Sequence, residues 1–310
     1  MKSVYSKYMK TLVTHDGVFH PDDVFAAASI SLLLNKQGES LTIIRSRNED
    51  TIASADFVSD VGGIFDTSKN RFDHHQLGGA GARENGVPYA SFGLVWKTYG
   101  LELCNHNQWV MDFVERRLVA GIDATDNGTA IRTKIFEDVS PYEFNDLLGT
   151  FLPSWCEDAS PEVMLNNFLE IKTLAERILT REIKKATDIF TAEQEVARIY
   201  ESSTDKRLLV LDQYYPWKKK AESLPEALIC VFPNNIVGNW IVYCVPDDFS
   251  KFTSRILLPQ SWAGLQAEEL AALTGVPDAV FCHRTLFMGS AKSKEGALAL
   301  AHLALDAAHK

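Results

Sequence analysis

The chain has 310 residues, of which 46% are hydrophobic and 23% are charged, and its formal net charge is −10. This length and composition predict a globular protein with a large buried core, divided into two domains. The negative charge argues against a broad basic surface that grips duplex nucleic acid, because such binding neutralises many phosphates.

The ends and the cysteines of the chain show which compartments to expect. Residues 1–10 are polar and basic rather than an apolar leader, and no stretch approaches the roughly 18 apolar residues that cross a bilayer. The five cysteines are scattered, odd in number and free of any C-x-x-C pairing. We therefore expect a reduced, cytoplasmic protein with no membrane partner. The oligomeric state stays open, with a homo-oligomer among the possibilities.

The first part of the chain alternates predicted strands and helices. Asp22 or Asp23 can cap the first helix and Gly38 ends it, while Pro88 precedes the second helix and Gly100 closes it. The apolar runs predict strands over residues 10–14, 41–45 and 57–60, and helices over residues 24–34, 89–99 and 108–120. This alternation predicts an α/β fold with a parallel sheet between helices on both faces.

The character of the chain changes near residue 140. Ser140-Pro141-Tyr142-Glu143 predicts a capping box, and Ser160-Pro161-Glu162 predicts the start of a long connecting helix. We expect one domain with this connector over residues 1–200 and a smaller α+β domain over residues 206–310. The second domain has predicted strands over 208–211, 227–232, 240–245 and 279–283, and predicted helices over 266–273 and 295–308.

Histidine and aspartate concentrate in four short segments of the first domain. The segments are T-H-D-G-V-F-H-P-D-D over residues 14–23, D-V-G-G over 60–63, D-H-H over 73–75 and D-A-T-D-N-G over 123–128. Imidazole nitrogens mixed with carboxylate oxygens suit Mn²⁺ or a similar divalent ion. The segments contain no cysteine, which argues against a structural zinc site. His15 and Asp60 each follow a predicted strand, where ligands of parallel sheets bind.

The spacing predicts a centre for two ions. His15, His20 and Asp22 can converge on one ion, and Asp60 has two oxygens with which to bridge both. His74 and Asp123 can complete the set of ligands around the second ion, with Asp22 either shared between the ions or assigned to this one. Two ions roughly 3.5–4 Å apart can clamp a phosphoryl oxygen and lower the pKa of a bridging water. Either Asp123 or Asp126 can be the ligand while the other caps a turn, and we prefer Asp123.

Two residues of the D-H-H segment are assigned to catalysis. Asp73 is suited to orient an imidazole through a hydrogen bond. His75, beside a predicted ligand but directed elsewhere, is suited to donate to the phosphate or to protonate the leaving oxygen.

The series H-x4-H-x-D, D-V-G-G, D-H-H and D-A-x-D-N-G resembles the DHH superfamily of phosphoesterases. The whole chain, from about residue 11 to the final helix, resembles the melanocyte-proliferating-gene (Myg) family. Further matching segments lie at residues 126–128, 216–218, 252–255, 258–265 and 280–283. The resemblance implies a DHH-type domain and metal-dependent hydrolysis with 3′-to-5′ RNA exonuclease activity.

The resemblance also assigns residues. It implies that one ion binds His15, His20 and Asp60, and that the other binds Asp22, Asp60, His74 and Asp123. It implies that His75 contacts the scissile phosphate and that Arg255 and His283 of the C-terminal domain hold substrate. Two departures stand out: Pro21 occupies a position where the family usually has cysteine, and residues 284–290 are bulkier than the family's glycine-rich run.

We therefore expect a two-metal phosphodiesterase that removes nucleotides from the 3′ end of short single-stranded RNA or related oligonucleotides. Its expected cofactors are two divalent ions, with Mn²⁺ preferred over Mg²⁺. One alternative is a phosphohydrolase acting on pyrophosphate or a nucleotide at the same centre. Another is a catalytically silent protein that binds metal or nucleotide.

Overall fold

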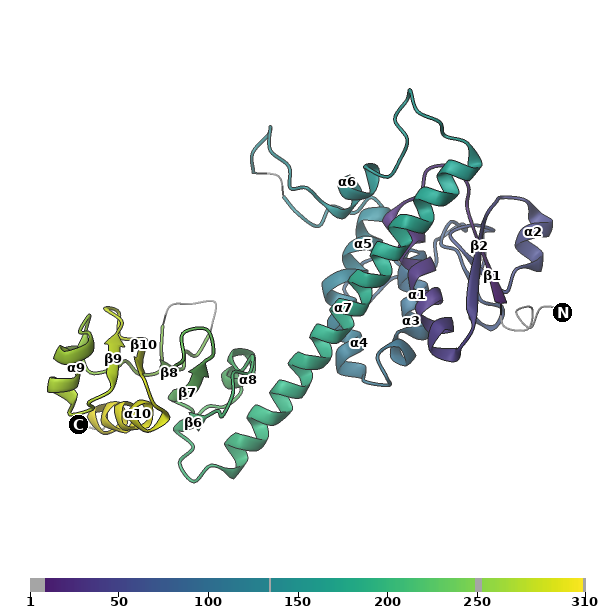
Figure 1. Cartoon of the computed structure of the whole chain (residues 1–310). Helices are drawn as coiled ribbons and strands as arrows, with labels where there is room; N and C mark the ends of the chain where they lie inside the picture. The colour runs from purple at the N-terminus through teal and green to yellow at the C-terminus, as the bar shows by residue number, and fades with distance from the viewer. Residues whose placement is uncertain (1–8, 134, 249–252, 309–310) are drawn as a thin grey trace, which may run out of the picture. The chain divides into compact units, whose positions relative to one another are not determined.

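The structure, a computed structural model, describes residues 9–133, 135–248 and 253–308 (Figure 1). The chain divides into two compact units, Met1–Thr187 and Asp188–Lys310. The division falls inside the helix α7 (Pro161–Ser202), whereas the sequence placed it in the polar turn that follows this helix. Among the described helices, none combines the length and apolarity needed to cross a membrane.

A five-stranded sheet in the order β2-β1-β3-β5-β4 forms the centre of the first unit. Four strands run parallel, and β4 pairs antiparallel with β5 at one edge. The strands are β1 (Met9–Thr14), β2 (Ser40–Arg45), β3 (Phe57–Ser59), β4 (Phe65–Asp66) and β5 (Arg71–Phe72). The three predicted strands are confirmed. The sequence missed β4 and β5, because two residues are too few to show a periodicity.

Helices cover both faces of this sheet, as predicted. Neighbouring residues of a strand point to opposite faces. On one face, the Phe57 ring contacts Tyr99 of α3 (Ser91–Leu103) at 6.4 Å between ring centroids. On the other face, Val13 and Val58 pack in a buried cluster with Ile52 of α2 (Glu49–Ser54). The α/β fold class with helices on both faces is therefore confirmed.

The first helices begin and end largely as their capping residues predict. Helix α1 (Pro21–Gln37) starts after His20 and ends at Gly38, whose φ of 77° is the left-handed conformation of a helix C-cap. Helix α3 passes through Gly100 instead of stopping there. A Cβ at this position would lie 2.9 Å from a Trp96 ring atom, so Gly100 lets an aromatic side chain pack against the helix.

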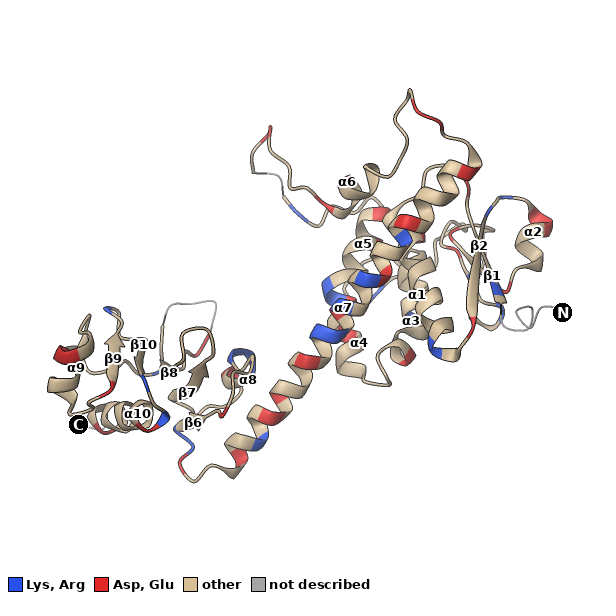
Figure 2. Ribbon diagram, in the orientation of Figure 1, with Lys and Arg blue, Asp and Glu red and all other residues tan. Residues whose placement is uncertain are grey.

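The next helices differ more from the prediction. The helix predicted over residues 108–120 continues to Asp126 as α4 (Gln108–Val114), a π turn (Glu115–Val119) and α5 (Ala120–Asp126). The predicted capping box at Ser140 is wrong: helix α6 (Phe144–Gly149) begins later, where Asp146 accepts the main-chain N–H of Glu143 at 2.7 Å. Helix α7 starts at Pro161 as predicted, and Figure 2 shows acidic and basic residues interspersed along it.

The second unit is α+β, as predicted. Its sheet has the order β6-β7-β8-β10-β9, and alternate residues of β7 pack in two separate cores, Ile229 in one and Cys230 in the other. The strands are β6 (Leu208–Val210), β7 (Ile229–Asn234), β8 (Asn239–Cys244), β9 (Ala279–Cys282) and β10 (Met288–Ala291). The helices that follow α7 are α8 (Lys218–Glu222), α9 (Ala267–Thr274) and α10 (Lys294–Ala308), with a 3-10 turn at Gln260–Trp262; another 3-10 turn, Thr67–Lys69, lies in the first unit.

Candidate metal centre

Three adjacent strands deliver the candidate ligands to one edge of the first sheet. Strands β1, β3 and β5 are parallel neighbours, so their carboxyl ends meet at the same edge. His15 follows β1 directly, Asp60 follows β3, and the Asp73-His74-His75 segment follows β5. The short β5 is therefore what brings the D-H-H segment beside the other two segments.

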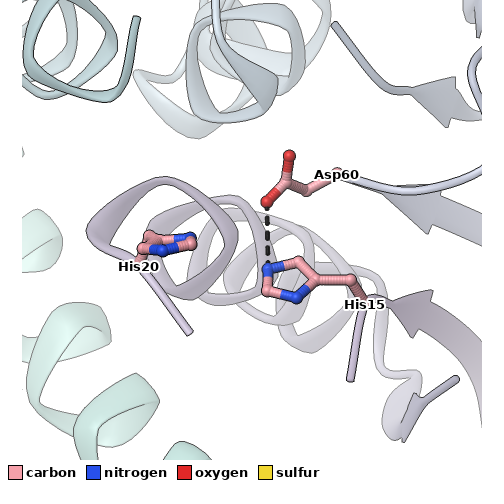
Figure 3. A group of neighbouring side chains, drawn as sticks. All are labelled: His15, His20 and Asp60. Atoms are coloured by element: carbon pink, nitrogen blue, oxygen red, sulfur yellow. Dashed lines mark ion pairs between the residues drawn. The ribbon is translucent and has the colours of Figure 1, made fainter. Parts of the chain in front are cut away.

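His15, His20 and Asp60 form the first group of candidate ligands (Figure 3). One ligand atom from each lies within 4.8 Å of the others. His15 Nδ1 lies 2.8 Å from the carbonyl oxygen of Asp16, and a carbonyl can only accept, so Nδ1 carries a proton. Nε2 is then the nitrogen available to an ion, and it lies 3.2 Å from Asp60 Oδ2.

His74 forms the second group with Asp22 and Asp126. His74 Nε2 lies 3.2 Å from Asp126 Oδ2 and 4.0 Å from Asp22 Oδ2. It also lies 3.3 Å from Asp60 Oδ1. The carboxylate of Asp60 therefore directs one oxygen to each group, which is the placement that a bridging ligand requires.

The two acids of α5, Asp123 in its first turn and Asp126 at its end, have different surroundings. Asp123 is fully buried; its Oδ2 accepts a hydrogen bond from Arg83 at 2.8 Å and its Oδ1 accepts one from the Gly93 main chain at 3.0 Å. Asp126, one turn later, is the acid that lies beside His74. The structure thus brings Asp126, and not the preferred Asp123, into a candidate ligand group. The ligand role of Asp123 stays a prediction without geometric support.

Asp22 is positioned by the amino end of helix α3. Its Oδ2 accepts the main-chain N–H of Ser91 at 3.0 Å, and its Oδ1 accepts that of Phe92 at 2.6 Å. Free N–H groups and the helix dipole at this end favour a carboxylate. The amino end of one helix therefore fixes Asp22 and, through Gly93, Asp123.

Unpartnered atoms and excess negative charge show that the centre suits a cation. Four buried atoms of the centre itself have no hydrogen-bond partner among the residues that the structure describes: His15 Nε2, Asp23 Oδ2, Asp60 Oδ1 and His74 Nε2. Burial alone would lower the pKa of both imidazoles. The ion pairs with the carboxylates of Asp23 and Asp60 instead raise the pKa of His15 to about 10, and those with Asp126 and Asp60 raise that of His74 to about 11. Nitrogen and oxygen donors without cysteine fit a divalent ion such as Mn²⁺ or Mg²⁺.

Asp73 holds the exposed His75 in a defined orientation. The Asp73 side chain is 2% exposed and that of His75 is 62% exposed. Asp73 Oδ1 lies 2.8 Å from His75 Nδ1 and also accepts the main-chain N–H of His75 at 3.1 Å. The other carboxylate oxygen, Oδ2, accepts a hydrogen bond from the main-chain N–H of Gly63. Asp73 thus leaves His75 Nε2 as the ring nitrogen that can meet a substrate.

A cavity of about 990 Å³ lies beside the candidate ligands in the first unit. The first ligand group, the His74 and Asp126 side chains of the second group, and His75 line it, together with Arg47, Arg117 and Arg132 from three separate segments. The side chains of these arginines are 57% to 64% exposed. Sequence reasoning missed them, although Arg47 follows β2 at the same strand edge as the ligands.

The two predicted substrate residues lie in the second unit. The Arg255 guanidinium donates to the carbonyls of Leu224 and Ala227 and pairs with Asp247 at 3.0 Å. Its side chain is only 9% exposed, so these contacts give Arg255 a structural role. His283 Nδ1 lies 2.8 Å from the Thr285 hydroxyl. The contacts of Arg255 and His283 with substrate stay predictions.

The chain is similar to one protein family and to named proteins from several organisms. The family model MYG1_exonuc, described as an uncharacterised protein family (UPF0160), matches residues 11–305. A Schizosaccharomyces pombe protein named MYG1 protein C694.04c is 28% identical, over 95% of this chain and 97% of its own length. The Homo sapiens protein named MYG1 exonuclease is 27% identical, over 94% of this chain and 85% of its own.

Solved structures that are similar over most of the chain include RecJ. RecJ from Thermus thermophilus in complex with Mn²⁺ is 12% identical and covers 96% of this chain and 52% of its own, with a TM-score of 0.28.

The packing at Gly93 yields a test of the site's architecture. A Cβ at Gly93 would lie 1.8 Å from Asp123 Oδ2 and 2.7 Å from a nitrogen of Arg83. We predict that Gly93→Ala destabilises the protein by about 1–3 kcal/mol, because the buried ion pair must move. Thermal unfolding measures the effect. The control is Gly149→Ala, where nothing lies within 4 Å of the added Cβ. Equal melting temperatures for the two variants would contradict the prediction.

Proposed function

Since the chain belongs to the MYG1_exonuc family, we propose that it is a metal-dependent hydrolase of the nuclease and phosphoesterase class. The match confirms the resemblance to the Myg family that the sequence predicts. Relatives bearing the name MYG1 exonuclease support the reaction class. The observation that carries the proposal is the carboxylate of Asp60, which directs one oxygen to His15 and the other to His74.

We assign two ion sites on either side of Asp60. His15 and His20 would hold the first ion, and Asp22, His74 and Asp126 would hold the second. We assign to Asp126 the ligand role that the sequence favoured for Asp123, because Asp123 forms an ion pair with Arg83. A pair of divalent ions at these sites supplies Lewis-acid polarisation of a phosphoryl oxygen and acidifies water near it.

The chain's own residues orient the substrate and move a proton. Asp73 accepts from His75 Nδ1 and keeps the imidazole at the wall of the cavity. His75 Nε2 then donates a hydrogen bond to the scissile phosphate or a proton to the leaving oxygen. Asp73 also stabilises the positive charge of a protonated His75, in the way that a buried carboxylate supports a catalytic histidine.

We propose short single-stranded RNA, cut from its 3′ end, as the substrate. Arg47, Arg117 and Arg132 line the cavity and can neutralise phosphates beside the one that is cut. Each guanidinium also pairs with one acid, respectively Asp16, Glu182 and Glu143, so the cavity is only locally basic. Few phosphate contacts and a net charge of −10 favour a short strand over a duplex.

A comparison of substrates tests the proposed activity. Purified protein with Mn²⁺ is incubated with labelled short RNA, the matching DNA, duplex RNA, pyrophosphate and nucleotides, and kcat/KM is compared. We predict release of mononucleotides from single-stranded RNA with little action on duplexes. His75→Ala should lower kcat by roughly 10²–10⁴-fold, the usual contribution of general acid–base catalysis.

The same comparison separates the alternatives. Hydrolysis of pyrophosphate without any action on RNA would replace the proposal with a small-molecule phosphohydrolase. A protein that binds metal but hydrolyses none of these substrates would be a silent binder.

Metal content tests the bridging role of Asp60. We predict about two bound Mn²⁺ ions per wild-type chain and loss of both in Asp60→Ala, because this carboxylate contacts both groups. Elemental analysis after gel filtration measures the content. Asp56→Ala is the control, since Asp56 accepts from Thr11 and pairs with Lys10 away from the ligand groups. Retention of one full equivalent in Asp60→Ala would argue against bridging.

The two acids of α5 should separate metal binding from stability. Asp126→Asn is predicted to weaken one Mn²⁺ site by tenfold or more while hardly changing the unfolding of the metal-free protein. Asp123→Asn is predicted to destabilise the fold by about 3–5 kcal/mol, because Arg83 loses a buried partner. Manganese titration and denaturant unfolding of both variants measure the two effects. The opposite pattern would restore Asp123 as the ligand.

A further inference from the structure

Asp23, which neither the predicted ligand set nor the two groups described above include, is fully buried beside the first group. Its side chain is 0% exposed and lies in the first turn of α1. Oδ1 accepts the main-chain N–H of His20 at 2.9 Å, which fixes the carboxylate. An acid in the first turn of a helix commonly makes this contact, and the contact accounts for only one of its two oxygens.

The second oxygen has no such explanation. Asp23 Oδ2 lies 3.1 Å from His15 Nε2 but has no hydrogen-bond partner among the residues that the structure describes. Arg45 interacts electrostatically with Asp23, but its guanidinium donates to the carbonyl of Gly17 at 2.7 Å and lies against the rings of Phe19 and Phe168. No ion pair between Arg45 and Asp23 occurs within the described residues. A buried carboxylate oxygen is therefore directed at His15 alone.

His15 Nε2 is shared by two carboxylates. Asp23 Oδ2 and Asp60 Oδ2 lie 3.1 Å and 3.2 Å from it. When Nε2 coordinates an ion, its lone pair is used and it has no hydrogen to donate. The positive charge that balances Asp23 Oδ2 would then come from the ion.

The number of carboxylates in each group also favours a role for Asp23 in the first group. The second group has two carboxylates of its own, Asp22 and Asp126, besides the shared Asp60. The first group has two imidazoles, which add no negative charge to a bound ion, and only the shared carboxylate. A divalent ion of the Mn²⁺ or Mg²⁺ kind favours anionic oxygen, so the first group without Asp23 is poor in charge.

We propose that Asp23 is a further residue of the first metal site, whose free carboxylate oxygen supplies that site with its own negative charge. This inference rests on the proposed function, because it requires an ion at His15. Asp23 thereby acts twice, since Oδ1 fixes the start of α1 and Oδ2 faces the ion.

The substitution Asp23→Asn separates the two roles. An asparagine keeps an oxygen that can accept the His20 N–H, but it removes the negative charge. We predict that D23N weakens one of two Mn²⁺ sites by at least tenfold and leaves the other within threefold of wild type. Isothermal titration of metal-free protein with Mn²⁺ measures both affinities, and thermal unfolding verifies the fold. The matched control is Asp50→Asn, which changes an exposed acid in the first turn of α2.

The outcomes distinguish this inference from the proposal on which it rests. Wild-type affinity for both ions in D23N would overturn the role of Asp23 and leave it a helix-capping residue, with the two-ion proposal intact. Absence of Mn²⁺ binding by the wild-type protein would overturn both. Should D23N fail to fold, Asp23→Glu tests the same point, because it keeps the charge but displaces the oxygen. Altered affinity at one site only supports the inference, and unaltered affinity at both contradicts it.

Discussion

The arrangement of the first unit depends on one carboxylate held between two imidazoles. Asp60 follows β3 with a positive φ of 56°, a conformation that non-glycine residues seldom adopt and that functional sites often retain. Its main-chain N–H donates to the carbonyl of Phe72 at 3.1 Å, which ties it to the strand that leads into the D-H-H segment. The strained residue thus directs its two oxygens to His15 and His74. The two imidazoles, which form ion pairs with Asp60, hold the pKa of this carboxyl below its usual range despite its burial.

A buried carboxylate cluster needs compensation, and the surrounding helices provide it. The amino end of α3 donates main-chain hydrogen bonds to Asp22 and Asp123, and Arg83 neutralises Asp123 and pairs with Glu115. Helix α3 begins where these acids can approach it closely, which is why Gly93 lacks a side chain there. Asp22, Asp60 and Asp126 stay uncompensated by any arginine or lysine ion pair within the described residues. The fold therefore neutralises the acids around the centre and leaves the centre itself for an ion.

Sequence patterns predicted those parts of the site that depend on strand ends. His15 and Asp60 follow runs long enough to show as strands, and parallel strands end at one edge. The choice between Asp123 and Asp126 was beyond these patterns, because it depends on a π turn over residues 115–119 and on an arginine forty residues away in sequence. The structural contacts of Arg255 could not be predicted from the sequence either. Its hydrogen bonds to the carbonyls of Leu224 and Ala227 arise from chain packing, which no local motif records.

The central claim is that Asp60 lies between two bound ions. The most direct measurement is diffraction from crystals grown with Mn²⁺, with anomalous difference maps collected at the manganese absorption edge. The account predicts two peaks on either side of the Asp60 carboxylate, roughly 3.5–4 Å apart, one beside His15 and the other beside His74. A single peak, or peaks that do not contact Asp60, would contradict it.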